Sequence, residues 1–418
     1  MNKKKDSKVV PNVRFKGFTD DWEQRKLGDV SEIIGGGTPS TNHPEYWDGD
    51  IDWYSPAEIS DQIYVKRSRR RITQLGYDNS SAKLLPPGTV LFTSRAGIGK
   101  TAILSQKSCT NQGFQSIVPH ENELDTYFIF SRTNVLKRYG ELVGAGSTFA
   151  EVSGKQMSAM NLMLPTTIQE QQLIGQFFKK LDCLITLHQQ KITRLIKLKK
   201  AMLEKMFPKK GSVIPEIRFN GFANAWEQRK LGDIADVTKL AGFEFTEHVV
   251  YSDEGNIIAL RGLNIKNGQL ILDDVKYIDG SNFSKLSRSK LFINDIMFTY
   301  VGTVGEVAII KENDRFYLAP NVSRIRVKSD DSPKFISHYM RTDNFKNKVI
   351  FPLIATSSQP ALSMENIRKF TINIPINREE QDCLAKYFDS LDHLITLHQR
   401  KIDKIKNMKK AMLDQMFI

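Results

Sequence analysis

The stretch "RAGIGKTAI" (95–103) has the spacing in this sequence that comes nearest to a phosphate-binding loop. Such a loop needs Gly-x-x-x-x-Gly-Lys-Ser/Thr, because backbone N–H groups surround the phosphates while the lysine meets the terminal phosphate. The end of the pattern fits, but Ser94 occupies the position of the required first glycine. The matching stretch "VGTVGEVAI" (301–309) has Glu306 in place of the lysine, and a carboxylate there would repel phosphate. Both stretches are therefore interpreted as tight turns between strands.

Other patterns that could support catalysis are incomplete. Three cysteines lack a Cys-x-x-Cys spacing and seven histidines lack a ligand spacing, so neither a zinc site nor a disulfide framework is predicted. The run "GGGT" (35–38) is a weak sign of nucleotide binding, and "LPPG" (85–88) is not the Asn/Asp-Pro-Pro-aromatic motif of amino-methyltransferases. The acidic pair Asp50 and Asp52 lacks a lysine at nuclease spacing. We expect no catalytic site, metal site or cofactor site in this chain.

The charge distribution favours nucleic acid as a partner. The net charge is +13, and residues 165–210 hold ten Lys and Arg against three Asp and Glu. A basic chain suits a polyanion. However, the region 31–164 is balanced and the region 235–374 carries only +2, which argues against simple phosphate binding. No apolar stretch approaches the roughly 20 residues of a membrane span, and no secretion signal is present, so a cytoplasmic protein is expected.

Local basic clusters supply candidate DNA contacts. "KRSRRR" (Lys66–Arg71) places five cations in six residues. Arginine and lysine can address guanine edges and asparagine can address adenine, although a solvated basic loop is the alternative interpretation. The candidate DNA-binding residues are Lys66, Arg67, Arg69, Arg70, Arg71, Arg95 and Lys100 in the first half, and Arg261, Asn264, Lys266, Arg288, Lys290 and Tyr300 in the second.

The elements that must position these residues are written twice. "WEQRKLGD" occurs at Trp22–Asp29 and again at Trp226–Asp233. Segment 11–30 matches 215–234 in 13 of 20 positions, and 165–207 matches 375–417 in 21 of 43. The chain is thus an internal duplication. The expected domains are a first head, 1–164 (constant 11–30, variable 31–164), a spacer helix, 165–210, a second head, 211–374 (constant 215–234, variable 235–374), and a second spacer helix, 375–418.

The two spacer segments are predicted to be long helices. Thr167 with Glu170, and Asn377 with Glu380, have the spacing of a capping box. A heptad pattern follows, and about 40 residues in each helix would extend roughly 60 Å. The break at "PKKGS" (208–212) favours antiparallel pairing. Polar seam residues are expected to fix the register rather than to bind metal. The predicted seam is Leu181, Ile185, His188, Ile192, Leu195 and Lys199 in one helix, and Leu391, Ile395, His398, Ile402, Ile405 and Lys409 in the other.

The two variable regions match poorly in sequence but share an order of elements. Each has strand-like runs, then a helical stretch, then a short turn at Ser153 or Ser363 and a final strand. We therefore expect an α+β protein in which one mixed fold occurs twice with two different surfaces. The strand-like runs are 89–94, 101–105 and 114–118, then 256–262, 295–302, 305–310 and 323–328, and the helical stretches lie near 124–139 and 333–350.

At this point the sequence resembles a known family. The stretches "GGGTPSTNHPEYWDGDIDWYSPAEI" (35–59), "PPGTVLFTSRAGIGKTAI" (86–103), "NDIMFTYVGTVGEVAI" (294–309) and "SQPALSMENIRKFTINIPINREEQ" (358–381) look like target-recognition-domain signatures. With the duplicated "LITLHQ" helices, they resemble the specificity subunit of type I restriction–modification enzymes over nearly the whole chain.

The resemblance implies a protein that is not a catalyst. Each target-recognition domain would read one half of a split DNA sequence, and the paired helices would set the gap. Two modification subunits would bring S-adenosylmethionine and methylate adenine, and restriction subunits would use ATP and Mg to cut DNA. Two other classes remain open from the residues alone. One is a coiled-coil scaffold with two protein-binding heads, and the other is a stand-alone methyltransferase or nuclease.

Overall fold

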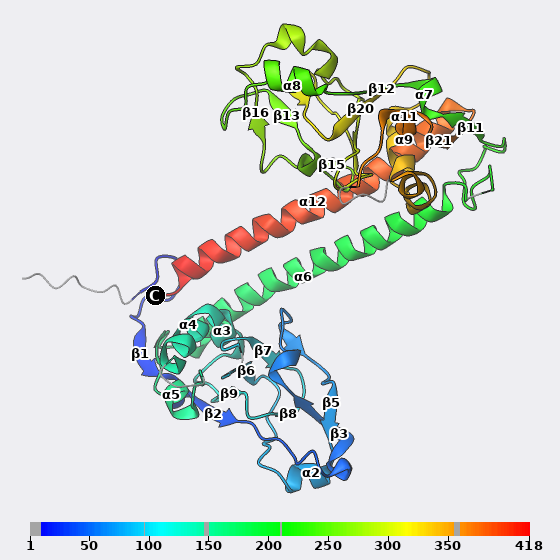
Figure 1. Cartoon of the computed structure of the whole chain (residues 1–418). Helices are drawn as coiled ribbons and strands as arrows, with labels where there is room; N and C mark the ends of the chain where they lie inside the picture. The colour runs from blue at the N-terminus through cyan, green and yellow to red at the C-terminus, as the bar shows by residue number, and fades with distance from the viewer. Residues whose placement is uncertain (1–9, 96, 146–149, 210, 355–359) are drawn as a thin grey trace, which may run out of the picture. The chain divides into compact units, whose positions relative to one another are not determined.

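The chain folds into two compact units, one formed by Met1–Gln189 with Arg400–Ile418 and the other by Gln190–Gln399 (Figure 1). The computed structural model describes residues 10–418 except 96, 146–149, 210 and 355–359. Each unit contains one mixed head and parts of both long helices, α6 (Ile168–Lys205) and α12 (Arg378–Met416). Among the described residues, no helix is both long and apolar enough to cross a bilayer.

The first head combines short strands with short helices. Its strands are β1 (Glu23–Lys26), β2 (Ser31–Gly35), β3 (Trp47–Tyr54), β4 (Tyr64–Val65), β5 (Arg70–Ile72), β6 (Val90–Phe92), β7 (Thr101–Leu104), β8 (Cys109–Thr110), β9 (Gln115–Pro119) and β10 (Asn161–Leu164). Its helices are α1 (Leu27–Val30), α2 (Gln74–Asp78), α3 (Thr126–Ser131), α4 (Thr133–Gly144) and α5 (Gly154–Ser158). Within the described residues, the sheets run β2-β9-β6-β7-β4, β5-β3-β8 and β1-β10.

The second head has a corresponding set of elements. Its strands are β11 (Glu227–Lys230), β12 (Ala235–Lys239), β13 (Ile258–Leu260), β14 (Ile265–Lys266), β15 (Gln269–Leu270), β16 (Lys276–Tyr277), β17 (Ile296–Thr299), β18 (Val307–Ile309), β19 (Phe316–Leu318), β20 (Val322–Val327) and β21 (Thr371–Ile374). Its helices are α7 (Leu231–Ile234), α8 (Gly242–His248), α9 (Pro333–Met340), α10 (Asp343–Phe345) and α11 (Met364–Arg368). In the part of this head that is described, the sheets run β12-β20-β17-β18, β16-β13-β19, β11-β21 and β14-β15.

The prediction of one mixed fold used twice is confirmed. β2-β9-β6-β7 corresponds to β12-β20-β17-β18, and the parallel pair β3/β8 corresponds to the parallel pair β13/β19. The predicted strand runs all contain strands of the two heads. Both predicted helical stretches are interrupted: 124–139 contains two helices, and 333–350 breaks after α9 at Arg341. In the first of them the break is built around one buried arginine. The chain leaves helical geometry at Arg132, whose buried guanidinium donates a hydrogen bond to the Met163 carbonyl at 2.9 Å.

The two glycine-containing stretches that resemble phosphate loops are turns, as predicted. β6 pairs antiparallel with β7, and β17 pairs antiparallel with β18. Gly99 and Gly305 adopt φ of +94° and +93° in these turns, a conformation that favours glycine. In both turns a threonine hydroxyl donates to a carbonyl four residues later, from Thr93 to Gly97 and from Thr299 to Thr303.

The repeated octapeptide forms the junction between each head and its helix. Trp22 and Leu27 are buried in one head, and Trp226 and Leu231 are buried in the other. β1 pairs antiparallel with β10 as β11 pairs with β21, in the same register. The duplicated residues therefore build the same structural joint twice.

A buried carboxylate lies at the centre of each joint. Glu170 accepts two hydrogen bonds from the Arg14 guanidinium, at 2.7 and 2.8 Å, and one from the Trp22 indole at 3.4 Å. Glu380 makes the equivalent contacts with Arg218 and Trp226. These bonds correct the predicted capping boxes. The Thr167 and Asn377 side chains do accept from the first turns, but the glutamates bind the constant segments instead of the helix caps.

The helices α6 and α12 pair antiparallel, and ion pairs fix their register. In the first unit the Lys409 ammonium binds the Asp182 carboxylate, and in the second unit Lys199 binds Asp392. The predicted seam residues are buried or half-buried, whereas Leu184 and Leu394 outside the seam are exposed. Shifting one helix by a heptad, about 10 Å, would separate both lysines from their carboxylates. The polar seam positions at Lys199 and Lys409 therefore specify register.

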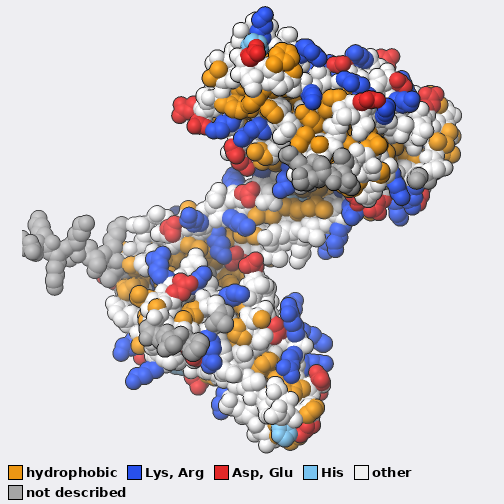
Figure 2. Space-filling view, in the orientation of Figure 1, with side chains coloured by type: hydrophobic (Ala, Val, Ile, Leu, Met, Phe, Trp, Pro, Cys, Tyr) orange, Lys and Arg blue, Asp and Glu red, His pale blue; other side chains and the backbone are white. Residues whose placement is uncertain are grey.

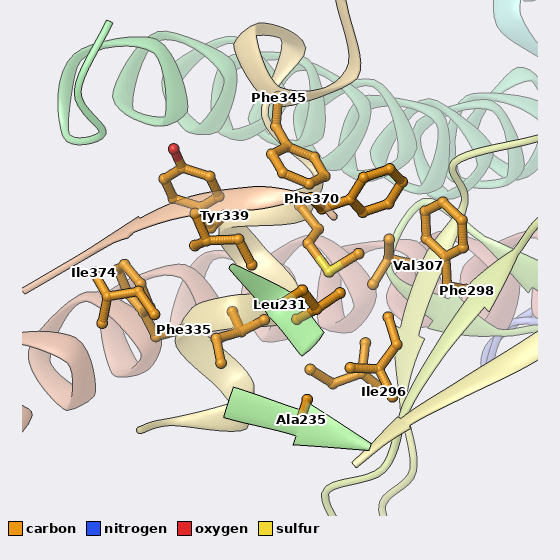
Figure 3. Packing of buried hydrophobic residues seen from close by; sticks show 14 of the residues in the cluster. Leu231, Ala235, Ile296, Phe298, Val307, Phe335, Tyr339, Phe345, Phe370 and Ile374 are labelled. Atoms are coloured by element: carbon orange, nitrogen blue, oxygen red, sulfur yellow. The ribbon is translucent and has the colours of Figure 1, made fainter. Parts of the chain in front are cut away.

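Each head is closed by the end of the helix from the other repeat. Phe207, at the end of the first repeat, packs against Trp226, Phe335, Tyr339 and Phe388 in the core of the second unit, with ring centroids 5.5–6.1 Å apart. Figure 3 shows this core where Phe335 and Tyr339 of α9 approach the sheet residues. In the first unit, Phe417 packs in the same manner against Trp22, Phe128 and Phe178.

Candidate nucleic-acid interface

The basic cluster Lys66–Arg71 spans the loop after β4 and the first two residues of β5, and two carboxylates hold the backbone of the loop. The N–H and hydroxyl of Ser68 both donate to Asp52 at 2.9 Å, and Asp52 is only 4% exposed. The Arg69 N–H donates to Glu58 at 2.6 Å. Figure 2 shows Lys and Arg side chains gathered on the edge of the first head near β5. Buried and half-buried carboxylates thus hold the loop backbone, while the side chains of Lys66, Arg67 and Arg69 are exposed.

The five cations of this loop divide into two groups. The Arg70 guanidinium lies 3.6 Å from the centroid of the Trp47 ring, and Arg71 lies 4.0 Å from Asp50. No carboxylate in the described part of the chain forms an ion pair with the other three, which are Lys66, Arg67 and Arg69. These three side chains are therefore the ones available for phosphates or base edges.

A hollow of about 380 Å³ adjoins the available cations. Lys66, Arg67 and Arg69 line it together with Tyr54 and Tyr64. Tyr54 is 1% exposed, and its hydroxyl has no hydrogen-bond partner within the described residues. Burial, with the nearby carboxylates of Asp52 and Glu58, raises the pKa of Tyr54 well above its usual value. The hydroxyl therefore stays protonated, and it lies below the surface of the hollow. Tyr54 was not predicted, although it lies in the quoted stretch 35–59.

Two further residues predicted in the first head lie away from this loop. Arg95 forms an ion pair with Glu151 at 3.0 Å and is half-buried. Lys100 is exposed and lines a separate hollow of about 610 Å³, which also contains Lys406, Lys409 and Lys410 of α12. The structure therefore does not bring all seven predicted residues of this head into one site.

The second head has its own hollow, of about 750 Å³, which brings together two predicted residues. Arg261 and Lys266 line it, with Leu263, Val301 and Pro320 as apolar neighbours. The Arg261 guanidinium donates to the Asp274 carboxylate at 2.8 Å and to its carbonyl at 2.9 Å. Its Nε has no partner within the described residues. The hollow therefore combines the fixed Arg261 guanidinium, the Lys266 ammonium and the Glu306 carboxylate with an apolar surface, a composition that suits contact with base edges and phosphates.

Asn264 and Tyr300 are placed differently from the prediction. Asn264 is fully buried, and its amide donates to the carbonyls of Ile271 and Asp274 at 2.9 and 2.7 Å. Its amide oxygen accepts from the Arg261 N–H at 3.0 Å. Tyr300 is only 9% exposed, and burial raises the pKa of its hydroxyl. Both side chains face inward and support the loops, so we do not retain them as DNA contacts.

Arg288 and Lys290 do not line the hollow that contains Arg261. Lys290 forms an ion pair with Asp314 at 2.6 Å, and Arg288 is exposed, with its carbonyl accepting from Arg324 at 2.9 Å. The sequence could not show that these two residues lie outside the hollow, because that depends on the tertiary path of the chain.

Equivalent positions of the two heads carry different side chains. The Ser55 N–H donates to Glu58 at 2.9 Å as the Arg261 N–H donates to Asn264, so Ser55 occupies the place of Arg261. Isolated bridges pair position 95 with 151 and 301 with 361, so Arg95 occupies the place of Val301. Lys100 and Glu306 follow the same turns. One backbone frame thus presents two chemically different surfaces.

Residues 19–197 and 223–407 each match the model of a family described as a type I restriction modification DNA specificity domain. Each match covers most of one head and most of the helix that follows it. Together they account for more than half of the chain.

Curated relatives resemble the chain over nearly its whole length. The type I restriction enzyme MjaIX specificity subunit of Methanocaldococcus jannaschii is 27% identical and covers 95% of this chain and 92% of the relative. The MjaVIII specificity subunit of the same organism is 24% identical, covering 94% and 92%. Among solved structures, the S subunit of a type I restriction–modification system from M. genitalium aligns with a TM-score of 0.63. It is 12% identical and covers 98% of this chain and 99% of that one, a likeness of fold.

Proposed function

We propose, from the premise that this chain belongs to the type I restriction–modification DNA specificity family, that its two heads read the two halves of one interrupted DNA sequence. The chain is a specificity subunit with DNA-recognition domains and is not itself a catalyst. The proposal adds the division of labour between the heads and the role of the helix pair.

The single observation that carries the proposal is the unlike chemistry at equivalent positions of one fold. Ser55 occupies the position that Arg261 has in the second head, Arg95 the position of Val301, and Lys100 the position of Glu306. Side-chain donors and acceptors distinguish base pairs in the major groove, so exchanging them on a fixed backbone changes the sequence that is read. If both heads read the same DNA sequence, we would expect similar side chains at these equivalent positions.

Within each head, we assign DNA contact to the cations that are available around a hollow. In the first head these are Lys66, Arg67 and Arg69. In the second head Lys266 meets this description, and Arg261 lines the same hollow while it stays bonded to Asp274. The Arg70 side chain, stacked on Trp47, instead supports the loop.

The helix pair is proposed to set the number of bases between the two half-sites. The ion pairs Asp182–Lys409 and Lys199–Asp392 hold α6 and α12 in one register. α6 has 38 residues, so it extends about 57 Å at 1.5 Å per residue. A rod of defined length and register gives a defined gap.

The chemistry is proposed to come from partner subunits. Two modification subunits would bring S-adenosylmethionine and methylate adenine, and restriction subunits would bring ATP, Mg and the nuclease. The alternative of a scaffold with two protein-binding heads is not favoured, because the family that matches both halves is defined as a DNA specificity domain.

Exchange of one head tests the proposal. Residues 31–164 are replaced by the variable region of another specificity subunit, and cells carrying the chimera with its modification partner are analysed by methylome sequencing. We expect one half-site to change while the other half-site and the gap are retained. The reciprocal exchange of residues 235–374 should change only the other half-site. A change in both half-sites after one exchange would contradict the separate reading of the halves.

A further inference from the structure

We propose that Arg341 is a positioning residue for DNA reading by the second head, because it holds the β14–β15 hairpin against the helix pair. The inference rests on the proposed function, in which Lys266 of this hairpin and Arg261 beside it contact DNA. Arg341 lies at the end of α9 and does not line the hollow around Arg261. It would therefore act through the hairpin and not by touching DNA.

The hairpin has a tight turn whose tip is bound on both sides. β14 and β15 pair Ile265 with Leu270 and Lys266 with Gln269, leaving Asn267 and Gly268 as the turn. These two residues adopt φ of +52° and +83°, as in the turns that match the twist of a two-residue hairpin. A hairpin this short is marginal on its own, so its position depends on contacts with the rest of the head.

Three side chains from separate parts of the second unit fix the hairpin. The Arg341 guanidinium donates to the Asn267 carbonyl at 2.9 Å, and the Asn267 N–H donates to the Glu306 carboxylate at 2.7 Å. The Gln269 amide donates to the Thr396 hydroxyl of α12 at 2.9 Å. Both polar groups of the Asn267 backbone are therefore used by charged side chains.

The absence of a side chain at Gly268 leaves the space that the Arg341 guanidinium occupies. A Cβ at this position would lie 2.1 Å from Arg341 Cζ, so a side chain here would displace the guanidinium. The positive φ of Gly268 adds a second cost for any L-residue with a side chain. The glycine and the arginine therefore depend on each other.

Arg341 is itself held by the helix pair. It donates to Asp392 of α12 at 3.0 Å, and Asp392 also binds Lys199 of α6, one of the pairs that fix the seam. Arg341 is 11% exposed, so this pairing is largely shielded from solvent. The guanidinium thus joins the hairpin to the helix register through a continuous set of charged hydrogen bonds, which are stronger than neutral ones.

The hairpin separates the proposed reading hollow from the charged cluster. Asn267 and Glu306 line the hollow that contains Arg261 and Lys266. The same two residues line a second hollow, of about 510 Å³, that contains Arg341, Lys199 and Asp392. Movement of the hairpin after loss of Arg341 would therefore change the shape of the reading hollow directly.

The first head lacks this device, which provides an internal control. Phe128 and Phe335 contact the equivalent residues Trp22 and Trp226, and counting onward from each phenylalanine places Asn134 where Arg341 lies. At the position of Glu306 the first head has Lys100. The proposal therefore predicts an effect on one half-site only.

The test uses the full chain assembled with its modification subunits. Methylome sequencing first gives the two half-sites. The rate of methyl transfer from S-adenosylmethionine is then measured on the intact duplex and on duplexes with one substituted base pair in either half-site. The ratio of the two rates is the discrimination of each head. Variants are Arg341→Ala, Arg341→Lys and Gly268→Ala, with Asn134→Ala as the matched control in the first head and Lys266→Ala as the reading residue.

For Arg341→Ala we expect the discrimination of the second half-site to fall by about tenfold, the order expected for loss of a charge-assisted hydrogen bond. Discrimination of the first half-site should be unchanged. Arg341→Lys should give a smaller fall in discrimination, because the ammonium keeps the charge but lacks the several N–H donors of the guanidinium. Gly268→Ala should lower discrimination of the second half-site alone, as Arg341→Ala does. It tests the positioning role if the Arg341→Ala protein does not fold. Asn134→Ala should leave both ratios unchanged.

Two results would overturn the assignment. If both half-sites lost discrimination together, Arg341 would have a general structural role. If Lys266→Ala lowered discrimination while Arg341→Ala and Gly268→Ala did not, the reading hollow would stand and the positioning role would be wrong. If Lys266→Ala left the second half-site unaffected, the failure would lie in the proposed DNA contact itself.

Discussion

Replacing Glu380 by alanine should destabilise the second unit strongly and leave the first unit intact. Glu380 is 1% exposed and accepts from Arg218 at 2.7 Å through both carboxylate oxygens, and from the Trp226 indole at 3.2 Å. Without the carboxylate, the Arg218 guanidinium, which is 14% exposed, keeps only its bond to the Asn224 carbonyl and loses its counter-charge, and the indole N–H loses its partner. Those groups would remain shielded from water, because Trp226 is 3% exposed.

The expected magnitude follows from the burial of the pair. Removing one partner of a buried ion pair costs about 3–5 kcal/mol, because the remaining charge is desolvated and unpaired. An exposed ion pair would cost only about 0–1 kcal/mol. The expected loss is a sizeable fraction of the stability of a typical domain, about 5–15 kcal/mol. Glu380→Gln keeps the shape and one acceptor oxygen, so its loss should be smaller than that of Glu380→Ala.

Hydrogen exchange during denaturant titration can localise the loss. Amides of β11 and β21, whose pairing includes Glu227 with Ile374, report on the second unit, and those of β1 and β10 report on the first. Glu170→Ala is the matched variant, since Glu170 binds Arg14 and Trp22 in the same way. It should shift the protection of β1 and β10 by a similar amount. A loss below about 1 kcal/mol for Glu380→Ala, the value of an exposed pair, would refute the reasoning.

Three further outcomes are expected. Phe207→Ala should lower the unfolding free energy of the second unit by about 3–5 kcal/mol, as for other buried phenylalanines, whereas the exposed Leu198→Ala should have little effect in denaturant titrations. Combined Lys66→Ala and Arg67→Ala should weaken discrimination of the first half-site in competition binding to duplexes, with Lys83→Ala as an exposed cationic control on the same head; equal weakening at both half-sites would contradict the assignment. Burial acts to raise the pKa of Asp389, but hydrogen bonds from His338 and Lys334 lower it to about 2. Because this pKa is depressed on folding, the stabilisation is present above about pH 4 and is lost as the pH falls toward 2. The thermal midpoint of Asp389→Asn should therefore approach that of the parent chain over this range, and a constant difference between them would exclude the carboxylate as the cause.

Much of the frame was predictable because its signals are local or repeated. The caps at Thr167 and Asn377 and the heptad spacing locate both helices to within a few residues. The antiparallel pairing follows from the helix break at 208–212, and the aspartates that meet Lys199 and Lys409 were not predicted. The duplication adds support, because each pattern occurs in both copies of the repeat.

The side-chain roles in the joints and hollows were harder to predict, because their partners are distant in sequence. Arg14 and Glu170 are 156 positions apart, so a capping role for the glutamate was the natural local reading. Asn264 resembles a base-reading residue by type, yet its amide is consumed by two carbonyls of a later loop. Arg70 and Arg67 are indistinguishable in the sequence, and only the position of Trp47 separates them.

The exchange of helix ends between repeats sets an order in which the heads can mature during synthesis. Trp22, Phe128 and Phe178 leave the ribosome early, but Phe417, which packs among them, is made after the whole second head. Phe207 has the reverse history, since it is already present when Trp226 emerges. The head translated first is therefore the last to be sealed, and its aromatic socket stays open for most of the time that the chain is being made.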